Sequence, residues 1–373
     1  MIVWREGRVT ALVGEWSGVV ECAADVYEAG ADRWSPCRAL AYPGLVGRPE
    51  VGDRVLLNTT ALEAGLGTGG YALVVAPLDR LPQVHDEGPG HLVKGRYTPM
   101  QATVLGVDEQ ESAHHELLRD ADDLSGMPVV VADLHSSLPA VLAGLRGPID
   151  GPMGDGRRQL RVAYVMTDGG ALPAWFSRTV AGLREAGWLA ACVTVGQAFG
   201  GDLEAVSLHS GLLAARLVVG ADVAVVAQGP GNLGSGTRWG FSGVAAGDAV
   251  NAVATLGGRP VAALRVSAAD ARPRHRGVSH HSLTAYGRVA LAPADVVVPV
   301  LGGPLGAQVR EQAATLGAPA GRHRLVEVAV DGLREQLEAS PVRLSTMGRG
   351  LHDDEPAFLA VAAAGRHAAS LTH

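Results

Sequence analysis

An arginine- and histidine-rich segment, residues 270–281, offers the strongest candidates for chemistry in this chain. It holds three arginines and three histidines against one acid, although the whole chain has a formal net charge of −7. Arginine forks bind carboxylate or phosphate bidentately, and histidine can transfer a proton near neutral pH. The segment therefore predicts a positive site for an anion, with its histidines as candidate catalytic groups. The candidates are Asp270, Arg272, Arg274, His275, Arg276, His280 and His281.

A glycine-rich segment is the second candidate for ligand binding. Residues 229–234 match G-x-G-x-x-G, the fingerprint of dinucleotide-binding loops. However, residues 235–243 delay the helix that should follow, and the next expected strand ends in Ser267 instead of a ribose-binding acid. The pattern therefore favours a phosphate, sulfate or carboxylate over NAD, and the cofactor stays open. The candidate binding residues are Gly229, Gly231, Gly234, Gly236, Thr237 and Arg238.

Four further polar residues follow expected strands: His135, Asp168, Asp202 and Glu204. The loops after the carboxyl ends of parallel strands share one edge of a sheet, so we expect these side chains to meet the two segments above. Asp168 is then a candidate acid or base. In the alternative interpretation the arginines pair with these carboxylates across the cleft and only tie the loops together.

Two other classes of function stay open. His275, His280 and His281, with a carboxylate such as Asp168 or Asp202, supply the ligand types of a zinc or manganese hydrolase. The motif HExxH is absent and His-x4-His-His is not a standard ligand spacing, so we assign no metal ligand. A non-catalytic sensor or assembly protein is the third hypothesis.

The elements that must position these residues change in character along the chain. Residues 1–90 show short β-type runs broken by glycine, which predict a small barrel-like module. Residues 91–125 read as a connecting segment. From residue 126 to 373 strand and helix patterns alternate, which predicts a mostly parallel, Rossmann-like sheet with helices on both faces.

Composition narrows the function classes further. Lys94 is the single lysine, so no Gly-Lys-Ser/Thr triplet exists and the P-loop NTPases are excluded. Cys22, Cys37 and Cys192 are scattered, which suits free thiols in a reducing compartment. The negative charge and 4% aromatic content favour neither nucleic acid nor membrane partners. We expect a cytoplasmic protein whose partner is an anionic small molecule, and homo-oligomerisation stays open.

The two long motifs also carry a family resemblance. Residues 229–243 and 274–284, with shorter stretches such as Arg96-Tyr97-Thr98-Pro99 and Thr346-Met347-Gly348-Arg349, resemble a bacterial family catalogued as a domain of unknown function, number 3866 in that series. The resemblance spans nearly the whole chain. It implies a shared architecture and transfers no activity.

Overall fold

The computed structural model describes residues 1–28, 30, 32–82, 88–147 and 159–372. The chain forms two compact units. The barrel unit comprises Met1–Pro89 and Gly95–Thr103, and the sheet unit comprises Gly90–Lys94 and Val104–His373. The chain thus enters the sheet unit briefly, returns to the barrel unit, and then leaves it for good.

The barrel unit is built on a closed barrel with the strand order β1-β2-β3-β5-β4. Closure pairs both edges of the sheet, and only β3 and β5 run parallel. Valine, alanine and leucine side chains fill the interior, together with the free thiol of Cys22. The elements are β1 (Trp4–Trp16), β2 (Val19–Glu28), β3 (Arg33–Ala41), α1 (Pro43–Val46), β4 (Arg54–Asn58), α2 (Thr60–Glu63) and β5 (Tyr71–Pro77).

The sheet unit is organised around eight strands in the order β11-β10-β9-β12-β8-β13-β16-β17. Every neighbouring pair is parallel. The central strands are buried runs of valine and alanine, as expected for a sheet covered on both faces. The strands are β8 (Pro128–Val131), β9 (Val162–Thr167), β10 (Ala191–Thr194), β11 (Leu203–Glu204), β12 (Val223–Gln228), β13 (Arg259–Ala263), β16 (Asp295–Val300) and β17 (Arg324–Ala329).

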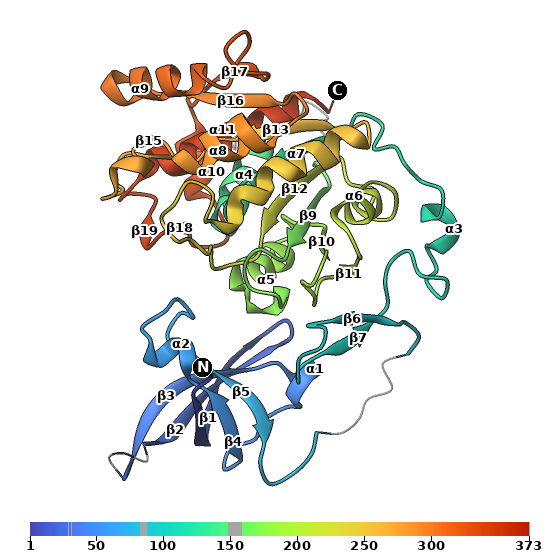
Figure 1. Cartoon of the computed structure of the whole chain (residues 1–373), viewed down its shortest axis with the longest axis vertical. Helices are drawn as coiled ribbons and strands as arrows, with labels where there is room; N and C mark the ends of the chain where they lie inside the picture. The colour runs from blue at the N-terminus through green and yellow to red at the C-terminus, as the bar shows by residue number, and fades with distance from the viewer. Residues whose placement is uncertain (29, 31, 83–87, 148–158, 373) are drawn as a thin grey trace. The chain divides into compact units, whose positions relative to one another are not determined.

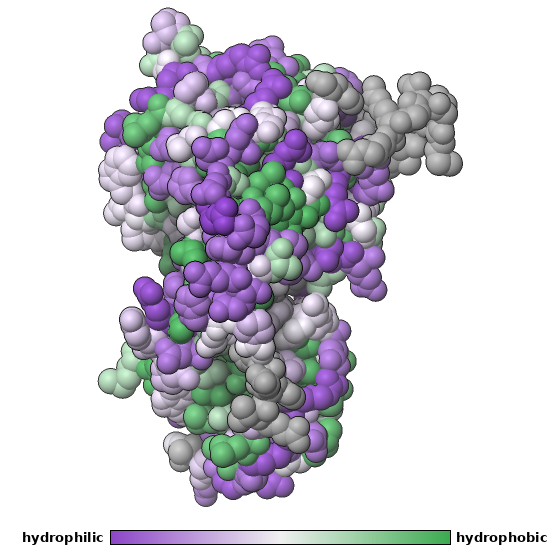
Figure 2. All heavy atoms as spheres, turned by 90° about the vertical axis from the view of Figure 1, so that its right-hand side faces the viewer, coloured by the Kyte–Doolittle hydropathy of each residue, from purple (hydrophilic) through white to green (hydrophobic). Residues whose placement is uncertain are grey.

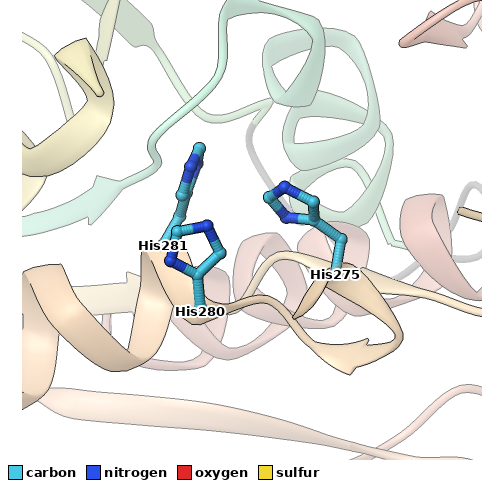
Figure 3. A group of neighbouring side chains, drawn as sticks. All are labelled: His275, His280 and His281. Carbon is cyan, nitrogen blue, oxygen red and sulfur yellow. The ribbon is translucent and has the colours of Figure 1, made fainter. Parts of the chain in front are cut away.

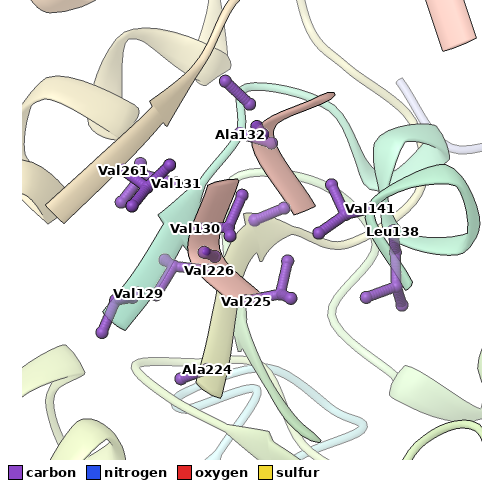
Figure 4. Close-up of a cluster of buried hydrophobic side chains, with 14 of the residues drawn as sticks. Val129, Val130, Val131, Ala132, Leu138, Val141, Ala224, Val225, Val226 and Val261 are labelled. Atoms are coloured by element: carbon purple, nitrogen blue, oxygen red, sulfur yellow. The ribbon is translucent and has the colours of Figure 1, made fainter. Parts of the chain in front are cut away.

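Helices cover both faces of this sheet (Figure 1). On one face α4 (Leu138–Leu145), α10 (Leu333–Glu338) and α11 (Glu355–Ser370) pack together, and on the other α6 (Leu208–Leu217) lies beside α7 (Ala245–Thr255). Figure 4 shows the apolar core between α4 and the valines of β8, β12 and β13. The sequence prediction of a small barrel followed by a parallel α/β sheet is confirmed.

Close packing of α4 on α11 depends on glycine. A Cβ at Gly144 would collide with the carbonyl oxygen of Ala362, and one at Gly365 would collide with that of Val141. The two helices therefore approach along their backbones, which places α11 tightly against the sheet.

Short elements complete the sheet unit. Val266–Ser267 (β14) pair with Gly277–Val278 (β15), and Ser345–Thr346 (β18) with Arg349–Gly350 (β19). Two further short strands are β6 (Leu92–Lys94) and β7 (Ala102–Val104). The remaining helices are α3 (His115–Leu118), α5 (Arg178–Glu185), α8 (His280–Thr284), α9 (Gly303–Ala314), the 3₁₀ turns η1 (His135–Ser137), η2 (Ala174–Phe176), η3 (Ser242–Val244) and η4 (Pro273–His275), and the π-helical turn η5 (Ala285–Val289).

The surface of the sheet unit is mostly hydrophilic on the face that Figure 2 turns towards the viewer, with a small group of hydrophobic side chains among them. Within the described ranges, no helix combines the length and the apolar character that crossing a bilayer requires.

The strand order creates a switch point between β8 and β13. Along the chain β8 is followed by β9, which lies beyond β12, whereas β13 is followed by β16 on the opposite side. The connections that leave these two neighbouring strands therefore run in opposite directions. In open α/β sheets the crevice at such a point is the usual place for a ligand.

Candidate functional site

A buried ion pair marks the switch point. Asp133 follows β8 and Arg265 follows β13, and both side chains are buried. Arg265 Nη1 lies 3.6 Å from Asp133 Oδ2, and His281 Nδ1 lies 3.5 Å from the same oxygen. Burial raises the pKa of the Asp133 carboxyl, but His281 and Arg265 outweigh it and hold that pKa below its ordinary value.

The arginine- and histidine-rich segment folds beside this pair. Antiparallel pairing of β14 with β15 closes residues 268–276 into a loop, and Pro273 starts the 3₁₀ turn η4 within it. Ser279 then caps α8, because its side-chain oxygen accepts a hydrogen bond from the His281 N–H. These local structures bring residues 275, 280 and 281 to one place.

His275, His280 and His281 form a histidine cluster whose rings gather around one point (Figure 3). Their ring centroids are 4.5–4.9 Å apart, and one nitrogen of each ring lies within 4.8 Å of the others. Phe241 stacks on His281 with a centroid separation of 3.7 Å. Ser279 Oγ lies 2.7 Å from His275 Nδ1 and fixes the orientation of that ring.

The histidine cluster is uncharged at neutral pH in at least two of its members. Burial, followed by the nearby positive charge of Arg265, lowers the pKa of His275 to about 3. Burial and then His281 lower the pKa of His280 to about 4. Each of these imidazoles therefore keeps one unprotonated nitrogen at pH 7.

An open pocket of about 710 Å³ borders the histidine cluster. Arginine side chains from three segments line it, one after β12, one in η4 and one in η5. Glycines, threonines, leucines and His280 make up the rest of its lining. The lining residues are Gly236, Arg238, Arg274, His280, Leu283, Thr284, Gly287, Arg288, Thr315 and Leu316.

The other two arginines of the predicted segment have structural partners. Arg272 forms a two-pronged ion pair with Asp270, with Nε–Oδ1 and Nη2–Oδ2 distances of 2.9 Å. Arg349 Nη2 adds a contact of 3.4 Å to the same carboxylate. Hydrogen bonds from Arg272 hold the pKa of Asp270 well below its usual range. Arg276 Nε donates to the Asp270 carbonyl, so neither Arg272 nor Arg276 faces the pocket.

The predicted carboxylates have partners elsewhere in the sheet unit. Asp168 Oδ2 accepts the Gln197 N–H at 2.8 Å. Asp202 pairs with Arg184 at 2.7 Å, and Glu204 accepts hydrogen bonds from Thr194 and Gly200. The alternative interpretation, in which these acids pair with the arginines of residues 270–281, does not match these contacts. Asp270 is the partner instead, because it lies two positions from Arg272 in the same turn.

His135 occupies a buried polar chain. Its Nδ1 lies 3.0 Å from the Tyr164 hydroxyl and its Nε2 lies 2.8 Å from Ser177 Oγ. The Tyr164 hydroxyl donates to the Gln228 carbonyl, and Ser177 Oγ caps α5 by accepting the Val180 N–H. Burial lowers the pKa of His135 to about 4. This histidine therefore connects β9, β12 and α5 and does not line the pocket.

Comparison with known proteins identifies the family of the chain. A family profile described as "Protein of unknown function (DUF3866)" matches residues 38–365. The chain belongs to the DUF3866 family. No curated protein and no solved structure matches it. The DUF3866 match starts in β3 and ends in α11, so it includes the whole parallel sheet, the histidine cluster and the pocket.

In this DUF3866 chain the glycine-rich segment reaches the pocket only through its end. Gly236 has a φ of +81°, a backbone conformation that favours glycine, and it lines the pocket with Arg238. Gly229 instead packs beneath the Ala171 carbonyl, where a Cβ would collide. Thr237 Oγ1 accepts the Gly240 N–H within the loop. Gly231 and Gly234 are exposed and lie outside the pocket lining.

Three site residues of this DUF3866 chain were not predicted from the sequence: Asp133, Arg265 and Arg288. Asp133 had a usable signal, because it follows a run of four buried strand residues directly before Leu134. Arg265 had the same signal after β13. Arg288 lies in the π-helical turn η5 outside the two motifs, and only the fold brings it to the pocket.

Proposed function

We propose that this protein binds an anionic small molecule, one that carries a phosphate or carboxylate group, in the pocket lined by Arg238, Arg274 and Arg288. The observation that supports this is an excess of positive charge. Among the described residues, none of these three guanidinium groups has a carboxylate or hydrogen-bond partner, although they line one pocket. Like charges gathered without counterions raise the local potential, and an anionic ligand relieves it.

The shape and walls of the pocket suit a small organic anion. Small-molecule sites typically measure about 300–1,000 Å³, and this pocket has about 710 Å³. Leu283 and Leu316 offer apolar surface, while the arginine forks match the planar oxygen pairs of phosphate and carboxylate. A ligand with an anionic group on a compact apolar body would use both kinds of surface.

Calorimetric titration with inorganic phosphate, sulfate and citrate tests this proposal. Arg274→Ala should weaken binding of the best of these probes by roughly 10- to 150-fold, because a charged hydrogen bond contributes about 1.5–3 kcal/mol. The matched control is Arg259→Ala, since Arg259 is exposed at the amino end of β13, the opposite edge of the sheet. Affinity should also fall as salt concentration rises.

Two results would contradict the proposal. One is the absence of measurable binding of any of the three anions to the intact chain at low salt. The other is that the variants Arg238→Ala, Arg274→Ala and Arg288→Ala all bind these anions as tightly as the control variant Arg259→Ala.

A further inference from the structure

We propose that His275, His280 and His281 bind one divalent transition-metal ion at the wall of the pocket. We propose further that the ion's remaining coordination position takes the anion, and this second half rests on the anion pocket proposed above. Zinc is the representative ion, because three imidazoles plus one open position is a common arrangement of a catalytic zinc centre.

The donor atoms are of the right kind and are already gathered. Neutral imidazole suits Zn, Cu, Fe and Ni, and the three rings offer nitrogens within 4.8 Å of one another. Zinc–nitrogen bonds of about 2.0–2.1 Å at tetrahedral angles place ligand nitrogens about 3.3 Å apart, so the rings must draw inwards when an ion binds. His280 and His281 are adjacent on the first turn of α8, so their side chains must rotate towards His275 for that movement.

One nitrogen of the histidine cluster lacks any partner in the described part of the chain. His280 Nε2 is buried and makes no hydrogen bond. Leaving a buried polar atom unsatisfied costs free energy, and such atoms are rare in folded proteins. A cluster that served only for packing would have no reason to leave this nitrogen open, whereas a metal ligand needs its lone pair free.

Partners on the far side of the rings fix which nitrogen is available. Ser279 Oγ has two lone pairs and can accept from both the His281 N–H and His275 Nδ1–H, which leaves His275 Nε2 free for an ion. His281 Nδ1 lies between Asp133 Oδ2 at 3.5 Å and Arg265 Nη1 at 3.1 Å. Because a guanidinium can only donate, Nδ1 accepts from Arg265 in the metal-free chain, and Asp133 Oδ2 has no hydrogen-bond partner in the described residues. Metal binding through His281 Nε2 therefore requires the proton to move to Nδ1, which would then donate to Asp133. This carboxylate behind a ligating histidine is the support that metal sites commonly have.

The positive surroundings determine what completes the coordination sphere. Three neutral imidazoles leave both charges of the ion uncompensated, and Arg274 lies on the same pocket wall as His280. Asp133 is already shared with Arg265 and offsets only part of this charge. An anion, either hydroxide or the bound ligand, is therefore the natural fourth partner, and Arg274 is placed to hold its other oxygens.

Cobalt(II) is the probe for the metal site. The intact chain is stripped with a chelator and titrated with Co²⁺, and visible absorption reports imidazole coordination of low symmetry. We expect saturation at one ion per chain, and the same stoichiometry for zinc by elemental analysis. His280→Gln and His281→Gln should abolish stoichiometric binding, while His209→Gln, at an exposed position on α6, should leave it unchanged. Asp133→Asn should weaken binding by about 10- to 100-fold.

The proposal is overturned if the intact chain gives no cobalt absorption and no stoichiometric zinc, or if the absorption persists in both His280→Gln and His281→Gln. If those variants fail to fold, X-ray absorption of the zinc-loaded intact chain decides the matter. Scattering from three imidazoles supports the site, and scattering from two or fewer overturns it.

Inorganic phosphate separates this inference from the proposed function. Phosphate added to the cobalt-loaded chain should change its absorption, and it should no longer do so in Arg274→Ala. If the chain binds phosphate but takes up no metal, the metal-site proposal is refuted and the anion-pocket proposal is supported. If the chain binds metal but phosphate changes nothing, the three-histidine site is supported. The anion pocket and the second half of this inference are then refuted.

Discussion

Arg272 and Arg274 are two positions apart in the sequence, but only one of them is neutralised by an acid in the described structure. Arg272 pairs with Asp270, whose side chain is 3% exposed, whereas Arg274 is exposed at the pocket. Arg272→Ala should therefore lower the free energy of unfolding by about 1–3 kcal/mol, with Arg349 retaining part of the interaction. Arg274→Ala should leave stability unchanged or slightly higher, because it removes one of several like charges. Urea unfolding of the two variants measures the difference. Equal losses would mean that Arg274 also has a structural role.

The Asp270 carboxylate also predicts how stability depends on pH. Its pKa is lowered in the folded protein, chiefly by Arg272, so its contribution is complete above the pKa of the unfolded chain. That contribution is lost as the pH falls through the lower, folded pKa. Asp270→Asn should therefore remove part of the acid-side slope of stability below about pH 4, the ordinary range of this group. Thermal melts of both proteins between neutral and acidic pH test this, and parallel curves would contradict it.

At the level of single residues, sequence reasoning identified residue types better than partners. The excess of arginine and histidine in residues 270–281 was visible without a structure. The division of labour within it was not, because the pairing of Arg272 with Asp270 depends on the turn that Pro273 begins. Asp133 and Arg265 become partners only through the neighbouring positions of β8 and β13.

Among the elements, the contact of α4 with α11 carries the sharpest prediction. Gly144→Ala places a methyl group against the Ala362 carbonyl, and neither helix backbone can give way without disturbing the sheet. We expect a loss of about 3 kcal/mol or an equivalent fall in Tm. Gly302→Ala is the control, because nothing lies within 4 Å of a Cβ there and the change at a helix cap costs about 1 kcal/mol or less. Equal melting temperatures of the two variants would show that the helices can separate.

The alternation of strand and helix patterns was sufficient to predict a parallel sheet. It was not sufficient to predict that β12 inserts between β9 and β8. The reason is physical: each central strand is a run of small apolar residues buried on both faces, and such runs carry no mark of their neighbours. The segment around His275 forms the 3₁₀ turn η4, which Pro273 favours in its first position.

For the molecule as a whole, Lys94 is the residue that ties the early segment 90–94 to the sheet unit. Its ammonium donates to the carbonyls of Gly196, Ala198 and Ala205 and lies 3.7 Å from Glu204. Lys94→Met should cost about 3–5 kcal/mol, because it leaves a buried carboxylate without its charge partner.

Combining Lys94→Met with Glu204→Gln separates the two losses. The double variant should recover part of the stability, since the uncompensated charge is gone while the three carbonyls still lack their donor. Chemical unfolding followed on the sheet unit measures both steps. An unchanged melting temperature in Lys94→Met would show that β6 is not anchored through this side chain. Its partners lie about a hundred residues away, so no local pattern in residues 90–94 could reveal the anchor.

The route of the chain between the two units also determines the order in which its parts can fold during synthesis. Residues 95–103 complete the barrel unit, where Met100 packs on the core, so that unit has all its residues once position 103 has emerged from the ribosome. Lys94 emerges earlier, yet its three carbonyl partners follow only 102 to 111 residues later. During that interval the barrel can fold while β6 waits in water, with its ammonium hydrated. The nascent protein therefore carries a finished first unit and an unplaced strand until β10 and β11 have been made.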